Sequence, residues 1–310
     1  MGAFTNSWAS AYMSFDYQNE PSTQGSRAPQ DEIYLNLGYA TIGNLNESPF
    51  YGSIGKMYAP FGRYNTAMVT TPETESLARI LDTTTVVGYS KNNISAQVFT
   101  YNTYQDNNSS SPANEGGAAV RYTKTDGNNP FQVGVSYVTN IADSQGMRDN
   151  GYGDDATNTF EGFDINGYNL THDVPGYDVY GSVGFKAFTL VGEFISATES
   201  FDASDLTFNG EGAKPQAVQA ELDYTTSIRS KPTTFGFMFS QTWQSLALNL
   251  PENSYNFAAS TSIWQDTIES IEYSYNKNYA SSDTSTGAGE AGPTGGGNSN
   301  VITLQLGVYF

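Results

Sequence analysis

Apolar and polar side chains alternate along most of this chain, and the alternation is clearest in its last ten residues, 301–310. Successive side chains of a β-strand point to opposite faces, so alternation with a period of two predicts a strand. Its two faces would be apolar on one side and polar or small on the other: Ile302, Leu304, Leu306, Val308 and Phe310 against Thr303, Gln305, Gly307 and Tyr309. An ordinary edge strand of a soluble β protein is the alternative for this segment alone.

Segments of the same kind recur from the beginning of the chain, about fourteen in all. They lie at about 9–17, 33–39, 49–59, 83–89, 94–101, 120–122, 131–137, 177–185, 188–194, 218–224, 235–239, 255–263, 271–276 and 301–310. An even number of strands of roughly ten residues is typical of an outer-membrane barrel. We therefore predict an all-β fold, a single antiparallel up-and-down transmembrane β-barrel that comprises residues 1–310 as one domain.

The connections between these segments alternate between long and short. Long ones lie at about 19–31, 60–82, 105–117, 140–175, 199–213, 245–253 and 279–300, and short ones at about 41–48, 90–93, 124–130, 186–187, 227–233 and 264–267. Outer-membrane barrels sort their connections in this way, with long extracellular loops and short periplasmic turns, whereas a soluble sandwich has no reason to. The even strand count places both termini on the periplasmic side and pairs the last strand with the strand at 7–17. Phe310 and the alternate residues that share its face should then point toward lipid, and Gln305 and Tyr309 should point toward the lumen.

Composition excludes several other classes. No apolar run approaches the ~20 residues that a membrane-spanning helix needs, and the mean hydropathy is −0.44. The chain has no cysteine, which removes disulfide frameworks, thiol catalysis and cysteine-ligated zinc. Its 13 basic and 32 acidic residues give a net charge of −19, which argues against nucleic acid as a partner. The partner that the predicted barrel implies is the lipid bilayer of the outer membrane. The chain opens on strand-like sequence, so an exported protein would have lost its signal peptide, and we expect no N-terminal plug domain.

The polar faces of the predicted strands list the groups that could meet a solute in the lumen. Fourteen strands should leave a lumen passable to small molecules. Acids outnumber bases on these faces, which predicts a preference for cations or for a solute that carries metal; the alternative is that each carboxylate pairs with a nearby cation and hydrates the wall. The charged residues are Asp16, Arg121, Asp178, Glu193, Glu221, Asp223 and Glu272, with Lys56 on a strand of ambiguous parity.

The loop at 60–82 is the candidate constriction. Thr71 is a predicted N-cap, Pro72 suits a first helical position, and Glu73 and Glu75 suit the positive end of a helix. Leu77, Ile80 and Leu81 form an i, i+3, i+4 stripe that must be buried, against the lumen wall or against Leu246, Leu248 and Leu250. We predict a short helix folded over or into the pore, with Arg63 and Arg79 as further lumen candidates; a helix lying on the external rim is the alternative.

Other chemistry is weakly supported. The longest loop contains Asp149, Asp154 and Asp155, whose oxygens could ligate Ca²⁺, but the spacing is not that of an EF-hand and a solvated acidic loop is the simpler interpretation. The single histidine, His172, lies in the same loop, and no metalloprotease or phosphate-binding motif is present. We therefore expect neither an enzyme nor a resident cofactor.

Two kinds of segment resemble known families. The aromatic end on Phe310 resembles the closing strand of bacterial outer-membrane barrels. The runs Phe50–Gly62 (FYGSIGKMYAPFG), Thr71–Arg79 (TPETESLAR), Trp243–Tyr255 (WQSLALNLPENSY) and Ser262–Glu272 (SIWQDTIESIE) resemble the LbtU/FslE-type siderophore porins, over about residues 7–310. Family proteins carry an extra N-terminal segment that these 310 residues lack.

The resemblance implies TonB-independent iron acquisition across the outer membrane of a Gram-negative bacterium, as a ferric siderophore of the rhizoferrin or legiobactin type or as ferrous iron. It assigns no binding residue. An acidic lumen suits Fe²⁺ better than an anionic ferric chelate, unless Arg63, Arg79, Arg121 and Lys56 gather at the constriction. The alternatives are a general, cation-leaning diffusion porin and a closed barrel whose surface loops act as an adhesin or a structural element.

Overall fold

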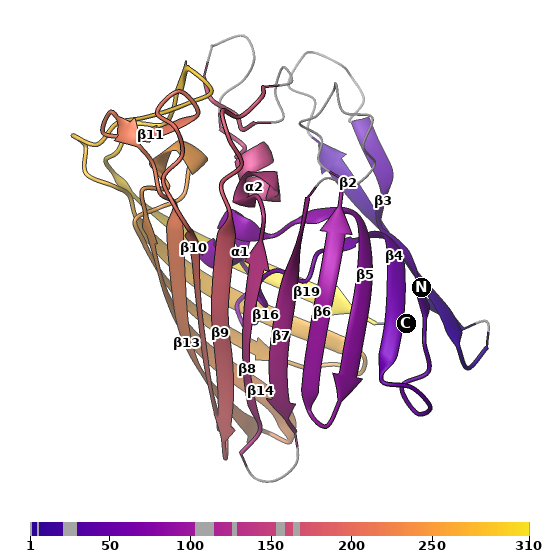
Figure 1. The fold of residues 1–310 in the computed structure, drawn as a ribbon. Helices are drawn as coiled ribbons and strands as arrows, with labels where there is room; N and C mark the ends of the chain where they lie inside the picture. Colours follow the sequence, from indigo (N-terminus) through magenta and orange to yellow (C-terminus); the bar gives the residue numbers. More distant parts are fainter. Residues whose placement is uncertain are drawn as a thin grey trace.

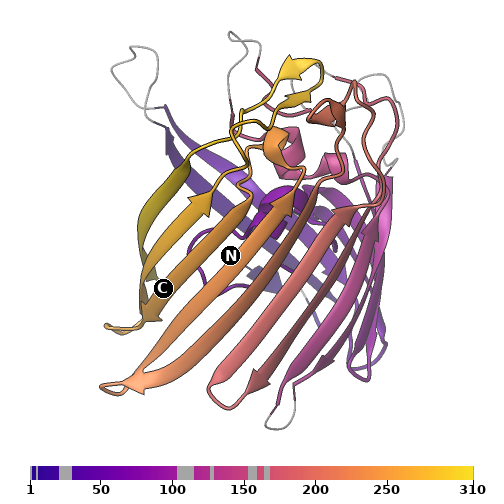
Figure 2. The same cartoon turned by 90° about the vertical axis from the view of Figure 1, so that its left-hand side faces the viewer.

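One antiparallel sheet of long strands dominates the computed structural model, which describes residues 2–4, 6–20, 30–102, 115–125, 129–152, 159–163 and 168–309. Within these ranges fourteen long strands follow one another in chain order and curve into a barrel-like wall (Figures 1 and 2). The predicted number and order of strands are confirmed. They are β2 (Ala9–Glu20), β3 (Gln30–Ile42), β4 (Phe50–Tyr58), β5 (Leu81–Lys91), β6 (Ile94–Tyr101), β7 (Glu115–Lys124), β8 (Phe131–Val138), β9 (Gly176–Phe185), β10 (Phe188–Ala197), β13 (Gln216–Ile228), β14 (Lys231–Trp243), β15 (Asn253–Thr261), β16 (Thr267–Lys277) and β19 (Asn298–Val308).

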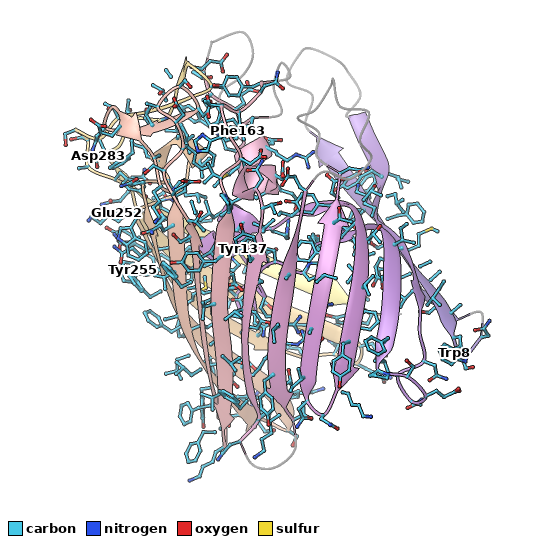
Figure 3. The ribbon with its side chains drawn as sticks, viewed as in Figure 1. Trp8, Tyr137, Phe163, Glu252, Tyr255 and Asp283 are labelled. Carbon is cyan, nitrogen blue, oxygen red and sulfur yellow. The ribbon has the colours of Figure 1, made fainter. Side chains whose placement is uncertain are left out.

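The outer face of the wall is apolar. Along β8, Phe131, Val133, Val135 and Tyr137 are 39–50% exposed, whereas the intervening Ser136 is buried. Figure 3 shows Tyr137 and Tyr255 among the side chains of the outer surface. A wall that exposes its apolar parity and buries its polar parity is suited to lipid outside and water inside. No helix in the described ranges is both long and apolar enough to cross a bilayer.

The short connections lie at one end of the wall and the long ones at the other, as predicted (Figures 1 and 2). Two of the short turns, Asn92–Asn93 and Arg229–Ser230, have positive φ at both central residues. This is the type I′ geometry whose twist matches that of the adjoining strands. The alternation of loop lengths along the chain therefore corresponds to the two ends of the sheet.

The two edges of the sheet differ from the prediction. Among the described residues β19 pairs with β16, and no pairing joins it to β2. The edge of β2 is instead occupied by a short strand, β1 (Gly2–Phe4), which pairs with Ser10–Tyr12 and uses backbone groups that β19 would need. The predicted inward orientation of Gln305 and Tyr309 agrees with the structure, because both line a cavity together with the loop residues Thr66 and Val69. Phe310 lies outside the described residues.

The buried apolar core lies at the long-loop end, beneath the connections, and was not foreseen from the sequence. Two of its largest fully buried side chains are Phe160 and Phe163, and Figure 3 shows Phe163 among the long connections. Four short strands form a second sheet there, in the order β12, β11, β17, β18. The elements at this end are η1 (Ile141–Asp143), α2 (Gln145–Arg148), β11 (Leu206–Phe208), β12 (Glu211–Gly212), η3 (Leu246–Leu248), β17 (Ser285–Gly287) and β18 (Glu290–Ala291).

The predicted helix is present as α1 (Glu73–Ala78) and is shorter than expected. Thr71 is not its cap: Pro72 takes the N-cap position with extended ψ of 154° and no side-chain hydrogen bond, so the first turn begins one residue later. Leu77 and Ile80 are 0% and 1% exposed and belong to the same apolar cluster as Leu248, which confirms the predicted burial of the stripe. The helix ends at Ala78, so Ile80 lies beyond it and Leu81 begins β5; of the three residues predicted to share one helical face, only Leu77 is on the helix.

Candidate constriction and anion site

The segment from Ala59 to Ile80, called the constriction loop below, lies on the inner side of the curved wall of strands. Figures 1 and 2 show its helix α1 within the wall. The helix packs against β10, β13 and β14 and against α2. Its polar side chains reach inward-facing residues of the wall: Thr74 Oγ1 donates to Gln219 Oε1 at 2.6 Å, and Ser254 Oγ donates to Glu73 Oε1 at 2.8 Å. The loop therefore narrows the lumen, and the alternative of a helix on the external rim is wrong.

Three buried carboxylates on the wall hold the backbone of the constriction loop. Glu193 on β10 accepts the N–H groups of Arg63 at 2.6 Å and Tyr64 at 2.9 Å. Glu221 on β13 accepts the Ala67 N–H at 2.6 Å. A carboxylate that accepts amide hydrogen bonds gains charge-assisted strength, roughly twice that of a neutral pair. These two wall residues thus bind the loop.

Glu272 on β16 continues the same arrangement farther along the loop. It accepts the N–H groups of Val69 and Thr70 and the Thr70 hydroxyl, and Asn256 Nδ2 donates to it at 2.8 Å. Glu193, Glu221 and Glu272 are 3%, 1% and 0% exposed. The structure brings the three together as predicted lumen residues, but it directs them at the loop backbone and buries them beneath it.

The other predicted wall acids have different surroundings. Asp178 is fully buried and accepts the Ser136 hydroxyl at 3.0 Å, while Ser136 Oγ in turn accepts the Gly62 N–H at 3.0 Å. Asp223 is 8% exposed beside Glu221. Asp16 on β2 contacts neither the loop nor the cavities described here. Only Asp178 among these three supports the loop, through the serine hydroxyl.

Three arginines line a cavity of about 410 Å³ beside the constriction loop. Arg63 and Arg79 come from the loop, and Arg121 comes from the inward parity of β7. In the described part of the chain, neither the Arg63 nor the Arg121 guanidinium has a hydrogen-bond or ion-pair partner. We call this space the arginine cavity; it is also lined by Tyr58, Pro60, Phe61, Glu75, Gln97, Ser136 and Tyr180.

Arg79 is held more firmly than the other two. Its Nε donates to Gln145 Oε1 at 2.9 Å, its guanidinium carbon lies 5.0 Å from the centre of the Tyr58 ring, and it forms an i, i+4 ion pair with Glu75. The Gln145 N–H also donates to the Arg79 carbonyl at 2.8 Å. The predicted candidates Glu75 and Arg79 are therefore one unit, fixed between α1 and α2.

Lys56 does not join this cluster. It is paired across β4 and β5 with Thr83, and its Nζ donates to the Leu35 carbonyl at 2.9 Å. It lines a separate cavity with Arg148 and Asp149. A gathering of four basic residues was the condition under which the constriction would suit an anionic chelate; three of them line the arginine cavity and Lys56 does not.

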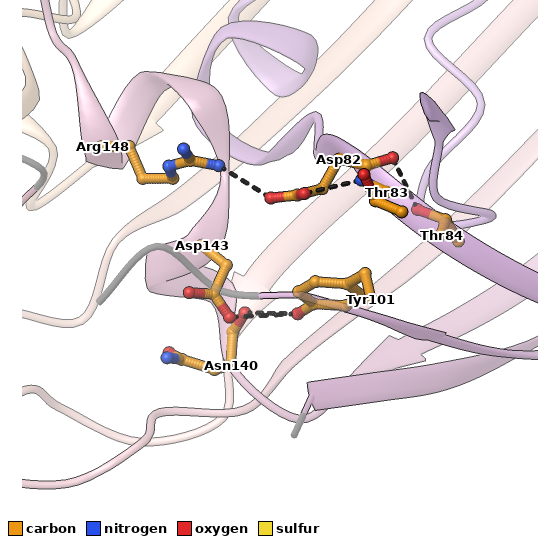
Figure 4. A network of polar contacts seen from close by, with 7 residues as sticks. All are labelled: Asp82, Thr83, Thr84, Tyr101, Asn140, Asp143 and Arg148. Atoms are coloured by element: carbon orange, nitrogen blue, oxygen red, sulfur yellow. Dashed lines mark hydrogen bonds and ion pairs between the residues drawn. The ribbon is translucent and has the colours of Figure 1, made fainter. Parts of the chain in front are cut away.

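A polar network at the rim fixes α2 and, through it, Gln145 (Figure 4). Tyr101 Oη donates to Asp143 Oδ2 at 3.2 Å, and Arg148 Nη1 pairs with Asp82 Oδ2 at 3.2 Å. Burial raises the pKa of the Asp143 carboxyl well above its usual range. The network joins the longest loop to β5 and β6, so the position of Arg79 depends on contacts far from it in sequence.

The calcium candidates form no site in the described residues. Asp149 Oδ1 accepts the Gly151 N–H at 2.9 Å in a local turn, and Asp154 and Asp155 lie outside the described ranges. Across the residues that are described, no group of three acidic, histidine or cysteine side chains is placed to hold a metal ion.

Sequence reasoning missed the polar groups that complete the arginine cavity. Gln97, Tyr180 and Gln145 carry no charge and belong to no motif. For Gln97 and Tyr180 the available signal was the inward parity of their strands, which is shared by many other residues. For Gln145 there was no signal.

Comparison by sequence finds proteins with the printed name UPF0422. No family model matches the chain. A "UPF0422 protein" of Coxiella burnetii is 35% identical over 98% of this chain and 64% of its own length. A "UPF0422 protein" of Legionella pneumophila is also 35% identical, over 100% of this chain and 60% of its own length. The chain thus spans less than two thirds of these relatives.

Solved structures with similar folds are outer-membrane proteins of low sequence identity. Salmonella typhi OmpF, in a complex with daunomycin, has a TM-score of 0.58 at 13% identity and covers 99% of this chain and 88% of its own. Pseudomonas putida OprB has a TM-score of 0.56 at 11% identity, over 97% and 82%. Vibrio cholerae OmpT has a TM-score of 0.53 at 10% identity, over 100% and 87%. This chain therefore has the fold of an outer-membrane porin.

Proposed function

We propose that this chain forms a diffusion channel of the bacterial outer membrane for small anionic solutes, ferric polycarboxylate chelates foremost among them. The apolar outer face and the porin fold support a channel in lipid. The observation that carries the choice of solute is the pair of unpartnered guanidinium groups, Arg63 and Arg121, on the arginine cavity. In a chain with 32 acidic and 13 basic residues, leaving two arginines unpaired beside a cavity reserves them for an external anion.

The placement of the acids favours anions over cations. The carboxylates that predicted a cation preference are buried beneath the constriction loop, where Glu193, Glu221 and Glu272 accept hydrogen bonds from its backbone. A solute in the arginine cavity therefore meets positive charge first. At about 4 Å, one unit-charge contact is worth about 1 kcal/mol in water and about 4 kcal/mol near a protein surface. This argues against ferrous iron and against a cation-leaning porin.

Two of the segments that resemble siderophore porins line the same cavity. The segments 50–62 and 71–79, which carry much of that resemblance, supply Tyr58, Phe61, Glu75 and Arg79 to its lining. A volume of about 410 Å³ is in the range of small-molecule sites, about 300–1,000 Å³. A ferric polycarboxylate is compact and anionic, so it suits this lining better than a hydrated metal cation does.

The proposal is tested in planar bilayers and in liposomes. We expect reversal potentials that show anion selectivity, and faster uptake of ferric rhizoferrin than of Fe²⁺. The double variant Arg63→Gln/Arg121→Gln should lose most of that selectivity. Lys124→Gln is the matched control, because Lys124 belongs to the same strand as Arg121 but lies on the opposite parity. Cation selectivity of the parent protein would refute the proposal, and complete absence of conductance would favour the closed barrel with interactive surface loops.

A further inference from the structure

Another cavity, of about 310 Å³, lies toward the long-loop end and is called the outer cavity here. Its lining comes from α1, α2 and the η3 connection and includes Thr71, Asn150 and Leu250. It shares two residues with the arginine cavity, Glu75 and Arg79. The ion pair between these residues thus separates the two spaces.

We propose that the Glu75–Arg79 ion pair is a carboxylate-exchange site for polycarboxylate solutes. A solute carboxylate that enters the outer cavity replaces Glu75 on the Arg79 guanidinium, and its further carboxylates reach Arg63 and Arg121. This inference rests on the proposed function and specifies the ligand class and the point of entry.

The two members of the pair differ in how firmly they are held. Arg79 is fixed by the Gln145 side chain, by the Tyr58 ring and by its own carbonyl. In the described residues, the carboxylate of Glu75 has Arg79 as its single hydrogen-bonding partner. The side chains are 33% exposed for Arg79 and 16% for Glu75. Glu75 can therefore rotate away while Arg79 stays in place.

Arg79 retains the donors that a second carboxylate needs. A guanidinium has five N–H donors in a planar fork, and Arg79 uses Nε for Gln145 and Nη1 for Glu75. The remaining donors can bind an incoming carboxylate before Glu75 leaves. Exchange thus proceeds without a step in which Arg79 is left unpaired.

The chemistry of exchange selects for more than one carboxylate. Glu75 is tethered to Arg79 through one turn of helix, so its effective concentration there is high, in the millimolar range or above. A monocarboxylate gains only one bond, to Arg79, and that bond replaces the one that Glu75 loses. A polycarboxylate gains contacts with Arg63 or Arg121 in addition, and these favour exchange.

The binding of citrate and of acetate to the purified protein in detergent, measured by calorimetry, tests this inference without requiring transport. We expect citrate to bind and acetate to bind at least tenfold more weakly. Glu75→Gln removes the internal competitor and should tighten citrate binding by about tenfold, whereas Arg79→Gln should weaken it by about tenfold or more.

A loosened helix could mimic the effect of removing Glu75, and Ser144→Ala controls for it. This variant removes the Ser144 Oγ bond to the Leu77 carbonyl, which joins the start of α2 to α1 at 2.7 Å, and it changes no charge and no lining residue of either cavity, so citrate affinity should change less than about threefold. Unchanged or weaker citrate binding by Glu75→Gln overturns the exchange site, as does equal tightening by Ser144→Ala. Anion selectivity that depends on Arg63 and Arg121 would then still support the proposed function, whereas citrate binding in a protein without conductance would support the site and refute the channel.

Discussion

Glu272→Gln should release the end of the constriction loop from the wall. In the parent protein the Glu272 carboxylate accepts the N–H groups of Val69 and Thr70, the Thr70 hydroxyl and the Asn256 amide. A glutamine keeps one acceptor oxygen and carries no charge. Its amide can turn that oxygen toward the Val69 and Thr70 N–H groups or toward the Thr70 hydroxyl and the Asn256 amide, and in either orientation two donors lose a charged acceptor. A hydrogen bond to a charged group contributes about 1.5–3 kcal/mol, so the loss of two such bonds costs at most about 3–6 kcal/mol. This loss is comparable to the stability of a docked loop.

The assay uses the absence of cysteine from the chain. A single cysteine at Met68, which is 8% exposed and next to the anchored Val69, should react slowly with a thiol reagent from the aqueous phase, and adding Glu272→Gln should accelerate the reaction at least tenfold. Single-channel conductance should rise in parallel. Glu269→Gln is the control on the same strand, because Glu269 bonds to the 262–267 turn and to nothing in the loop. Equal labelling rates and equal conductance in Glu272→Gln and the parent protein would refute the anchoring role of the wall carboxylates.

Three further predictions follow from the same region. Burial raises the pKa of the Glu73 carboxyl from 4.5 to about 7. Docking of the loop should therefore be strongest below pH 4.5 and should weaken, by at most about 3 kcal/mol, as the pH rises to about 7. Conductance should rise over this pH interval, and Glu73→Gln should abolish the pH dependence. Leu77→Ala should lower the free energy of unfolding by about 2–5 kcal/mol in urea titrations of the detergent-solubilised protein, because the side chain is fully buried. Gly134→Ala should narrow the arginine cavity and lower conductance, since a Cβ there would lie 2.3 Å from the Tyr180 ring, which has the lumen as its direction of escape; unchanged conductance would contradict this.

The strand architecture was accessible from the sequence because its causes are local. Alternation with a period of two depends on neighbouring residues alone, and it located all fourteen long strands. The sorting of long and short connections follows from the same strands. The burial of Leu77 was also predictable, because an apolar residue on the inner face of a short helix must be covered. Ile80 is buried too, although it lies beyond the end of the helix, and both belong to one apolar cluster with Leu248, which was among the predicted partners.

The meaning of the charges was decided by the tertiary structure. Glu193 and Arg63 are 130 residues apart in the chain. Glu221 and Ala67 are 154 residues apart, and Glu272 and Thr70 are 202 residues apart. A carboxylate on an inward parity can serve a solute or a backbone amide equally well, and the sequence pattern is the same in both cases. The choice depends on which segment fills the lumen, so composition predicted an acidic lumen where the folded chain exposes arginines.

Sequence alone therefore determined a porin-like wall and a helix that had to be buried, since alternation and amphipathicity act over a few residues. The folded chain decided that the loop crosses the lumen, that the wall acids bind its backbone, and that Arg63, Arg79 and Arg121 meet across one cavity while Lys56 does not. The physical reason is that electrostatic and hydrogen-bond partners are set by distance in space, and a curved sheet of fourteen strands around one loop brings together residues that are far apart in the chain.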